Sequence, residues 1–126
     1  PQWTGGGVVF APKPRDYSMK MNKREKQIAI KSALTSKVLD SKFIVVDEFA
    51  LEEVKTSKFA KILANLNAPK ALVVTKDKDE KVILSARNIP TVKTTMTNSI
   101  NVYDILKYDS LVITKDAVAA IEEVYA

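Results

Sequence analysis

Four short apolar runs alternate with segments of helical periodicity along most of this chain. The runs cover residues 43–49, 71–75, 91–95 and 111–114. Strands that are apolar on both faces are typical of a parallel sheet covered by helices. Right-handed crossovers then place helices on both sides of that sheet. The sequence therefore predicts an α/β fold, a three-layer sandwich with a mostly parallel four-stranded sheet, preceded by an extended basic arm.

Five helices are expected around these runs, because apolar residues recur there at helical spacing. Polar residues at the start of each segment predict its N-terminal cap. The expected helices span 23–39 with Asn22 as cap, 56–67 with Thr56 or Ser57, a short segment to about residue 86 with Asp77 and Glu80 as a capping box, 102–107 with Asn101 and Asp104, and 116–126 with Asp116 in its first turn.

Residues 1–21 do not have the pattern of a packed element. Gly5, Gly6 and Gly7 carry no helix preference, and prolines at 12 and 14 favour an extended path. The apolar run 8–10 is expected to dock on the body, with Phe10 in contact with its core. The chain therefore divides into an arm, residues 1–21, and an α/β body, residues 22–126. The arm alone is expected to be disordered, because it can bury too little surface to offset its ordering entropy.

Positive charge is concentrated in the first third of the chain. Residues 1–42 hold nine Lys or Arg and three acids, a net charge of +6, whereas residues 43–126 have a net charge of −1. By itself, a lysine-rich helix face is usually solvated, and the basic face of the helix at 23–39 carries Lys23, Arg24, Lys26, Lys31 and Lys37. Here a basic arm adjoins it, and Trp3 and Tyr17 are interleaved with the cations, a pattern that suits RNA phosphates and stacked bases. A structural role for these two rings remains an equal alternative.

Several classes of site are disfavoured by composition. The chain has no Cys and no His, which excludes disulfides and removes the commonest general base and metal ligand. Its longest apolar runs are too short to cross a membrane, and it begins at Pro1 without the apolar core of a signal peptide. The run Gly5–Gly7 lacks the strand, helix and Lys-Ser/Thr context of a phosphate loop. A cytosolic protein without a metal or other cofactor is expected.

Three polar groups outside the basic region admit a functional interpretation. Asp77, Asp79 and Glu80 could suggest a cation site, but a solvated turn with a helix cap explains them better. Asp47 and Glu48 follow the first strand, where α/β enzymes often bind ligands. They would form the pocket of the main rival, a small nucleotide- or metabolite-binding enzyme. Arg87 and Asn88 could bind RNA or simply end a helix. A free RNA-binding translational regulator is the second rival.

Ordered motifs along the whole chain resemble a known family. They are Trp3-x-Gly5-Gly6-Gly7-Val8-x-Phe10, Pro12-x-Pro14-Arg15-x-Tyr17, residues 31–34 (KSAL), 84–90 (LSARNIP), 101–106 (NVYDIL) and 110–114 (SLVIT). This series resembles bacterial large-subunit ribosomal protein four.

The resemblance implies a non-enzymatic, structural protein of the large ribosomal subunit in the cytoplasm. Its implied partners are large-subunit ribosomal RNA, neighbouring large-subunit proteins and, in some members, the protein's own messenger leader, with no membrane and no small-molecule substrate. It also implies that residues 1–20 are the returning half of a loop that reaches the peptide exit tunnel, so that the family's N-terminal strand and loop tip would precede Pro1. The predicted RNA-binding residues are Trp3, Gly5, Gly6, Gly7, Lys13, Arg15, Tyr17, Lys20, Lys23, Arg24, Lys26, Lys31, Arg87 and Asn88.

Overall fold

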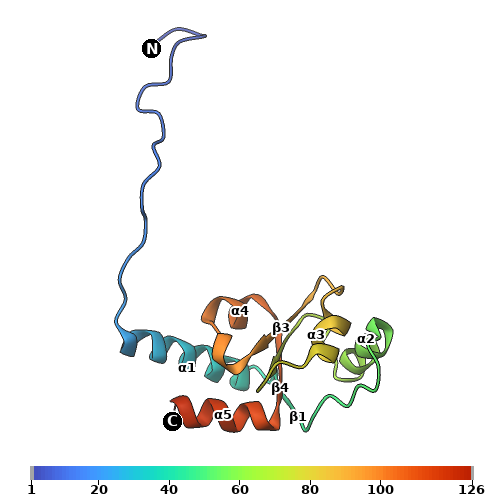
Figure 1. Cartoon of the computed structure of the whole chain (residues 1–126). Helices are drawn as coiled ribbons and strands as arrows, with labels where there is room; N and C mark the ends of the chain where they lie inside the picture. Colours follow the sequence, from blue (N-terminus) through green and yellow to red (C-terminus); the bar gives the residue numbers. More distant parts are fainter. Residues whose placement is uncertain (1, 126) are drawn as a thin grey trace.

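A four-stranded parallel sheet forms the centre of the protein (Figure 1). The computed structural model describes residues 2–125, so Pro1 and Ala126, the outer ends of the two predicted units, lie outside the described residues. All three strand pairs are parallel, which confirms the predicted fold class. The strands are β1 (Phe43–Val46), β2 (Ala71–Thr75), β3 (Val92–Met96) and β4 (Ser110–Thr114), in the spatial order β1-β4-β2-β3.

Helices cover both faces of this sheet. On one face, α2 (Thr56–Asn65) and α3 (Glu80–Ala86) bury Phe59, Leu63 and Val82 against it. On the other face lie α1 (Lys23–Leu39), α4 (Val102–Lys107) and α5 (Lys115–Tyr125), which contribute the buried side chains of Ala33, Ile105 and Ala117. A 3-10 turn, η1 (Thr97–Ser99), follows β3.

The central strand β2 shows why both faces need cover. Ala71 and Val73 are buried in the core beneath α2 and α3, whereas Leu72 and Val74 are buried beneath α1, α4 and α5. Successive side chains of a strand point to opposite faces, so a strand that is apolar throughout must be buried on both. This strand lies where it was predicted, at residues 71–75.

Most predicted boundaries agree with the structure, and the differences are local. Helices 23–39 and 102–107 are confirmed, whereas the first strand ends at Val46 rather than at residue 49. The cap of α3 was predicted wrongly: Oδ1 of Asp79, not of Asp77, accepts from the N–H groups of Lys81 and Val82. The predicted caps of α2 are also wrong, because that helix begins after Lys55, which makes no side-chain cap hydrogen bond. β3 lies one residue later than predicted, at 92–96.

The arm leaves the body from the N-terminal end of α1 (Figure 1). Residues 2–22 contain no helix or strand, and every one of them is exposed. The expectation that residues 8–10 dock on the body is wrong, because Phe10 is 99% exposed and Val8 and Val9 are exposed as well. Prolines at 12 and 14, which fix their own φ, keep the chain extended between this apolar run and the body.

Candidate nucleic-acid interface

The first half of α1 is exposed on all sides. Residues 23–28 are all exposed, and Ala33, in the second half of the helix, is its buried residue. At its start the backbone N–H of Asn22 donates to Oε2 of Glu25 at 3.2 Å, which gives a partner to a group that the helix leaves free. The sequence therefore anchors α1 by its second half and leaves its first half exposed.

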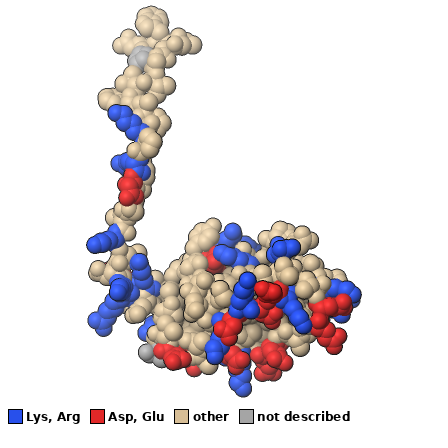
Figure 2. Space-filling model, in the orientation of Figure 1, with Lys and Arg blue, Asp and Glu red and all other residues tan. Residues whose placement is uncertain are grey.

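Seven predicted RNA-binding cations lie on this half of the helix and on the arm. All are exposed, and none takes part in an ion pair within residues 2–125. Figure 2 shows Lys and Arg side chains along the arm and at its base, and most of the acidic side chains on the parts of the body away from it. Unpaired exposed cations gathered in this way produce a positive potential that attracts a polyanion. The seven are Lys13, Arg15, Lys20, Lys23, Arg24, Lys26 and Lys31.

Aromatic rings accompany the cations on the arm. The guanidinium carbon of Arg15 lies 4.0 Å from the centre of the Tyr17 ring, in a cation–π contact. The rings of Tyr17 and Trp3 are largely exposed. Phe10, Lys13, Arg15 and Tyr17 together line one open hollow along the arm. Both rings are thus accessible, although their use in stacking remains a prediction.

The arm's carboxylate, Asp16, is engaged locally. Its two oxygens accept from the backbone N–H of Ser18 at 2.9 Å and from the Ser18 hydroxyl at 2.8 Å. The backbone hydrogen bond, followed by the hydroxyl, holds the pKa of Asp16 below its usual value. Asp16 therefore stays ionised beside Arg15 and Tyr17, and its acceptor oxygens are partly occupied by Ser18.

The three glycines lie at a turn near the tip of the arm. The N–H of Gly6 donates to the carbonyl oxygen of Trp3 at 3.1 Å, and Gly5 adopts a φ of +79° that side chains rarely tolerate. A Cβ added at Gly5 or Gly7 would meet no heavy atom within 4 Å. The turn explains Gly5, whereas no close contact within the described residues explains Gly7. A close approach of RNA to these glycines remains a prediction.

Lys37 lies on the same helix but has a structural partner. Its Nζ donates to the carbonyl oxygen of Tyr108 at 2.8 Å and to that of Asp109 at 3.1 Å. These carbonyls follow the last turn of α4, where a cation is favourable. The expectation that Lys37 belongs to a free basic face is therefore wrong, because this ammonium group ties α1 to α4.

Arg87 and Asn88 lie apart from the basic arm. They follow α3, which packs with α2 on the sheet face opposite α1. Arg87 is the C-terminal cap residue of α3, and its N–H donates to the carbonyl oxygen of Ile83 at 3.0 Å. The structure thus gives Arg87 a local role and does not bring these two residues together with the other predicted ones; their RNA binding remains a prediction.

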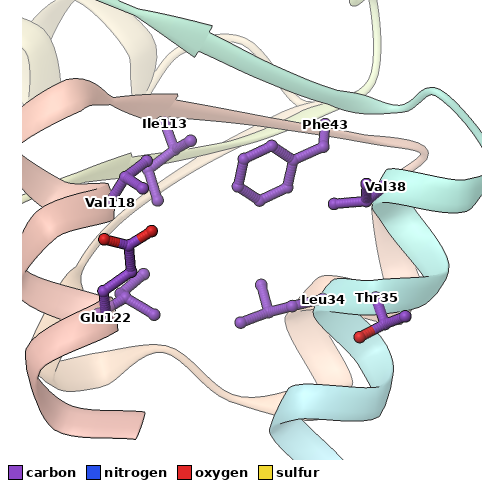
Figure 3. Close-up of a pocket in the computed structure, with 8 residues that line it drawn as sticks. Leu34, Thr35, Val38, Phe43, Ile113, Val118 and Glu122 are labelled. Atoms are coloured by element: carbon purple, nitrogen blue, oxygen red, sulfur yellow. The ribbon is translucent and has the colours of Figure 1, made fainter. Parts of the chain in front are cut away.

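The apolar groove between α1 and α5 offers little to the small-molecule alternative. A groove of about 370 Å³ between α1 and α5 is lined mostly by apolar side chains, among them Leu34, Phe43 and Val118 (Figure 3). Its polar lining residues are Thr35 and Glu122. This groove therefore lacks the paired acid and base that general acid–base catalysis uses. Among residues 2–125, no three His, Cys, Asp or Glu side chains are grouped as a metal site would require. None of the helices in that range is long and apolar enough to span a membrane.

Comparison with known proteins decides the family. The model of the ribosomal protein L4/L1 family matches residues 1–124. The chain belongs to the ribosomal protein L4/L1 family. This membership confirms the resemblance that the sequence motifs indicated.

Curated L4/L1 relatives match the whole chain. The large ribosomal subunit protein uL4 of Agathobacter rectalis is 70% identical over 126 residues, which is 100% of this chain and 61% of that protein. The uL4 proteins of Lachnoclostridium phytofermentans and Lachnospira eligens are 70% and 64% identical over the same shares. The chain therefore spans about three fifths of the length of these relatives.

Two exposed side chains of this L4/L1 chain, both on α4, are not among the residues predicted from the sequence. Tyr103 is 71% exposed on α4, and Nζ of Lys107 lies 5.7 Å from the centre of its ring. The signal in the sequence was a Tyr and a Lys four residues apart, which lie on one face of a helix. The sequence alone does not show which face of this short helix packs on the sheet, so the spacing by itself indicates no site.

Proposed function

We propose that this chain is a structural, non-catalytic part of the large ribosomal subunit that binds ribosomal RNA. In this role it supports subunit assembly in the cytoplasm, contacts neighbouring large-subunit proteins and contributes the arm to the peptide exit tunnel. One observation carries the proposal: seven cations that form no ion pair within residues 2–125 and two accessible aromatic rings lie on one arm and the adjoining half-helix. Membership of the L4/L1 family and the name of the relatives support the same assignment.

The chemistry of this surface suits folded RNA. Cations on the arm and α1 would neutralise phosphates, which releases counterions and makes binding salt-dependent. Trp3 and Tyr17 would stack on unpaired bases, which are the parts of RNA that proteins read most readily. The same surface would accept the protein's own messenger leader, so competition between ribosomal RNA and leader transcripts tests that further partner.

The test is a salt titration of binding to large-subunit ribosomal RNA transcripts. The variant carries Arg15→Ala, Lys23→Ala and Arg24→Ala together. Each lost phosphate contact should reduce the log–log salt slope by about 0.7–0.9, so the slope should fall by about 2 to 3 and the affinity with it. The control carries Lys55→Ala, Lys58→Ala and Lys61→Ala on the α2 side, with the same loss of charge. Equal slopes and affinities for the unaltered chain and both variants would overturn the proposal.

A further inference from the structure

Helix α4 presents one exposed, partly apolar face. Tyr103 is 71% and Leu106 62% exposed, whereas Asp104 and Ile105 on the other side of the helix are buried. Residues three positions apart on a helix are neighbours, so these two exposed side chains lie side by side on one face. The exposed face of α4, consisting of Tyr103, Leu106 and Lys107, is called the α4 surface below.

The charges around the α4 surface favour an anionic partner. Nζ of Lys107 lies 5.7 Å from the ring centres of both Tyr103 and Tyr108, and within residues 2–125 this lysine forms no ion pair. The nearby carboxylate of Asp104 is already paired, since its Oδ2 accepts from Nζ of Lys93 at 2.6 Å. The surface therefore presents an unpaired cation between two aromatic rings, with its buried acid neutralised.

The position of α4 points to the same partner as the arm. Helix α4 packs against α1, and Figure 1 shows it on the side of α1 toward which the arm extends, with α5 on the other side. Apart from Asp109, which follows α4, exposed carboxylates gather elsewhere, in the loop between β1 and α2 and on α5, where Glu52, Glu53, Glu122 and Glu123 lie. A polyanion bound along the arm would meet the α4 surface without passing an acidic patch.

We propose that the α4 surface is a second contact for the RNA that the arm binds. Tyr103 stacks on an unpaired base, Leu106 covers the edge of that base or its sugar, and Lys107 binds a neighbouring phosphate. Aromatic rings beside cations are what sequence-tolerant recognition of unstacked bases uses. This inference rests on the proposed function and adds to it a body site that the arm residues do not include.

The experiment measures binding of the full chain to large-subunit ribosomal RNA transcripts at several salt concentrations. Tyr103→Ala should lower the affinity about fivefold to a hundredfold, because stacking on one base is lost, and should leave the salt slope unchanged. Tyr103→Phe, the matched control, keeps the ring and should bind like the unaltered chain. Lys107→Gln should reduce the slope by about 0.7–0.9, whereas Lys61→Gln on α2 should not.

The outcomes separate this inference from the proposed function. If Tyr103→Ala and Lys107→Gln bind RNA like the unaltered chain while the Arg15, Lys23 and Arg24 variant loses affinity, the arm surface stands and the α4 surface is overturned. If Tyr103→Ala keeps its RNA affinity but co-sediments less with large subunits, the surface is a protein contact and the RNA inference is again overturned. Since Tyr103 is largely exposed, an unchanged melting temperature should accompany the loss of binding.

Discussion

Nζ of Lys93 donates a hydrogen bond of 2.6 Å to Oδ2 of Asp104, which joins the edge strand β3 to helix α4. The side chain of Asp104 is 5% exposed and that of Lys93 is 48% exposed. The side-chain amide of Asn101 also donates to Oδ2, at 3.0 Å. One buried carboxylate thus fixes the start of α4 to the sheet edge and determines where Tyr103 and Lys107 are presented.

Asp104→Asn should destabilise the body at neutral pH by about 1–2 kcal/mol, because it removes a charged hydrogen bond whose lysine is half-exposed and can be rehydrated. Burial alone would raise the pKa of Asp104, but hydrogen bonds from Lys93 and Asn101 more than offset this and leave it below its usual value. The contribution to stability is therefore present above about pH 4 and is lost as the pH falls below that. Urea unfolding between pH 7 and pH 3 measures it.

Lys93 titrates in the opposite direction. The hydrogen bond to Asp104 raises the pKa of Lys93, so the contribution of Lys93 to stability is present at neutral pH and is lost only in strong alkali.

The matched control for Asp104→Asn is Asp109→Asn, at an exposed carboxylate that follows α4, which should change the free energy of unfolding little. A destabilisation by Asp104→Asn that stays constant from pH 7 to pH 3 would contradict the assignment of the pair.

Phe59→Ala should destabilise the body by about 3–5 kcal/mol, because it leaves a cavity at a side chain that is 0% exposed. Phe59 lies beside Phe49, with ring centres 5.8 Å apart, in the core beneath α2 and α3. Phe10→Ala removes the same atoms from a residue that is 99% exposed and should change the free energy of unfolding by less than about 0.5 kcal/mol. Comparable losses in chemical denaturation would mean that the arm docks on the body.

Local signals explain why much of the fold could be predicted from the sequence. The helix at 102–107 has Asn101 at its cap, whose side chain accepts from the N–H of Asp104 at 2.9 Å. The strand at 71–75 is apolar in its first four residues and is bounded by Pro69 and by charged residues. Both signals involve residues only a few positions apart in the chain, so they can be seen in the sequence.

Long-range contacts explain most of what the sequence could not show. The strand order β1-β4-β2-β3 places strands side by side that are far apart in the chain. The hydrogen bond from Lys37 to the carbonyl oxygen at the end of α4 likewise joins distant residues. The cap of α3 failed for another reason: Asp77 and Asp79 both precede Glu80, and only geometry shows that Asp79 accepts the free N–H groups. In the candidate site, the charge of the arm follows from composition, whereas the exposure of Tyr103 depends on how α4 packs, which the sequence does not show.

Lys37→Met and Lys31→Met should separate stability from RNA binding. Lys37→Met removes two hydrogen bonds to the carbonyls after α4 and should destabilise the body by about 1 kcal/mol. Lys31→Met, on the same helix but exposed, should leave stability within about 0.5 kcal/mol. It should instead reduce the salt slope of RNA binding by about 0.7–0.9, which Lys37→Met should not. The reverse pattern in denaturation and RNA titration would refute both roles.

Ser41→Gly should stabilise the protein by about 0.5–1 kcal/mol. Helix α1 ends in a Schellman motif, since the N–H of Ser41 donates to the carbonyl oxygen of Val38 and that of Lys42 to that of Lys37. Ser41 adopts a φ of +56°, which costs an L residue about 1–2 kcal/mol and glycine almost nothing. The greater freedom of glycine in the unfolded chain cancels part of this gain.

The matched substitution is Ser36→Gly, in the interior of the same helix, where glycine should destabilise by about 0.5 kcal/mol. Helix α2 supports the comparison, because Asn67 holds the corresponding position there with a φ of +53°, and asparagine tolerates this conformation better than serine does. The midpoints of thermal and urea unfolding should therefore rise for Ser41→Gly and fall for Ser36→Gly. A loss of stability for Ser41→Gly as large as that for Ser36→Gly would show that the left-handed turn after α1 is not strained.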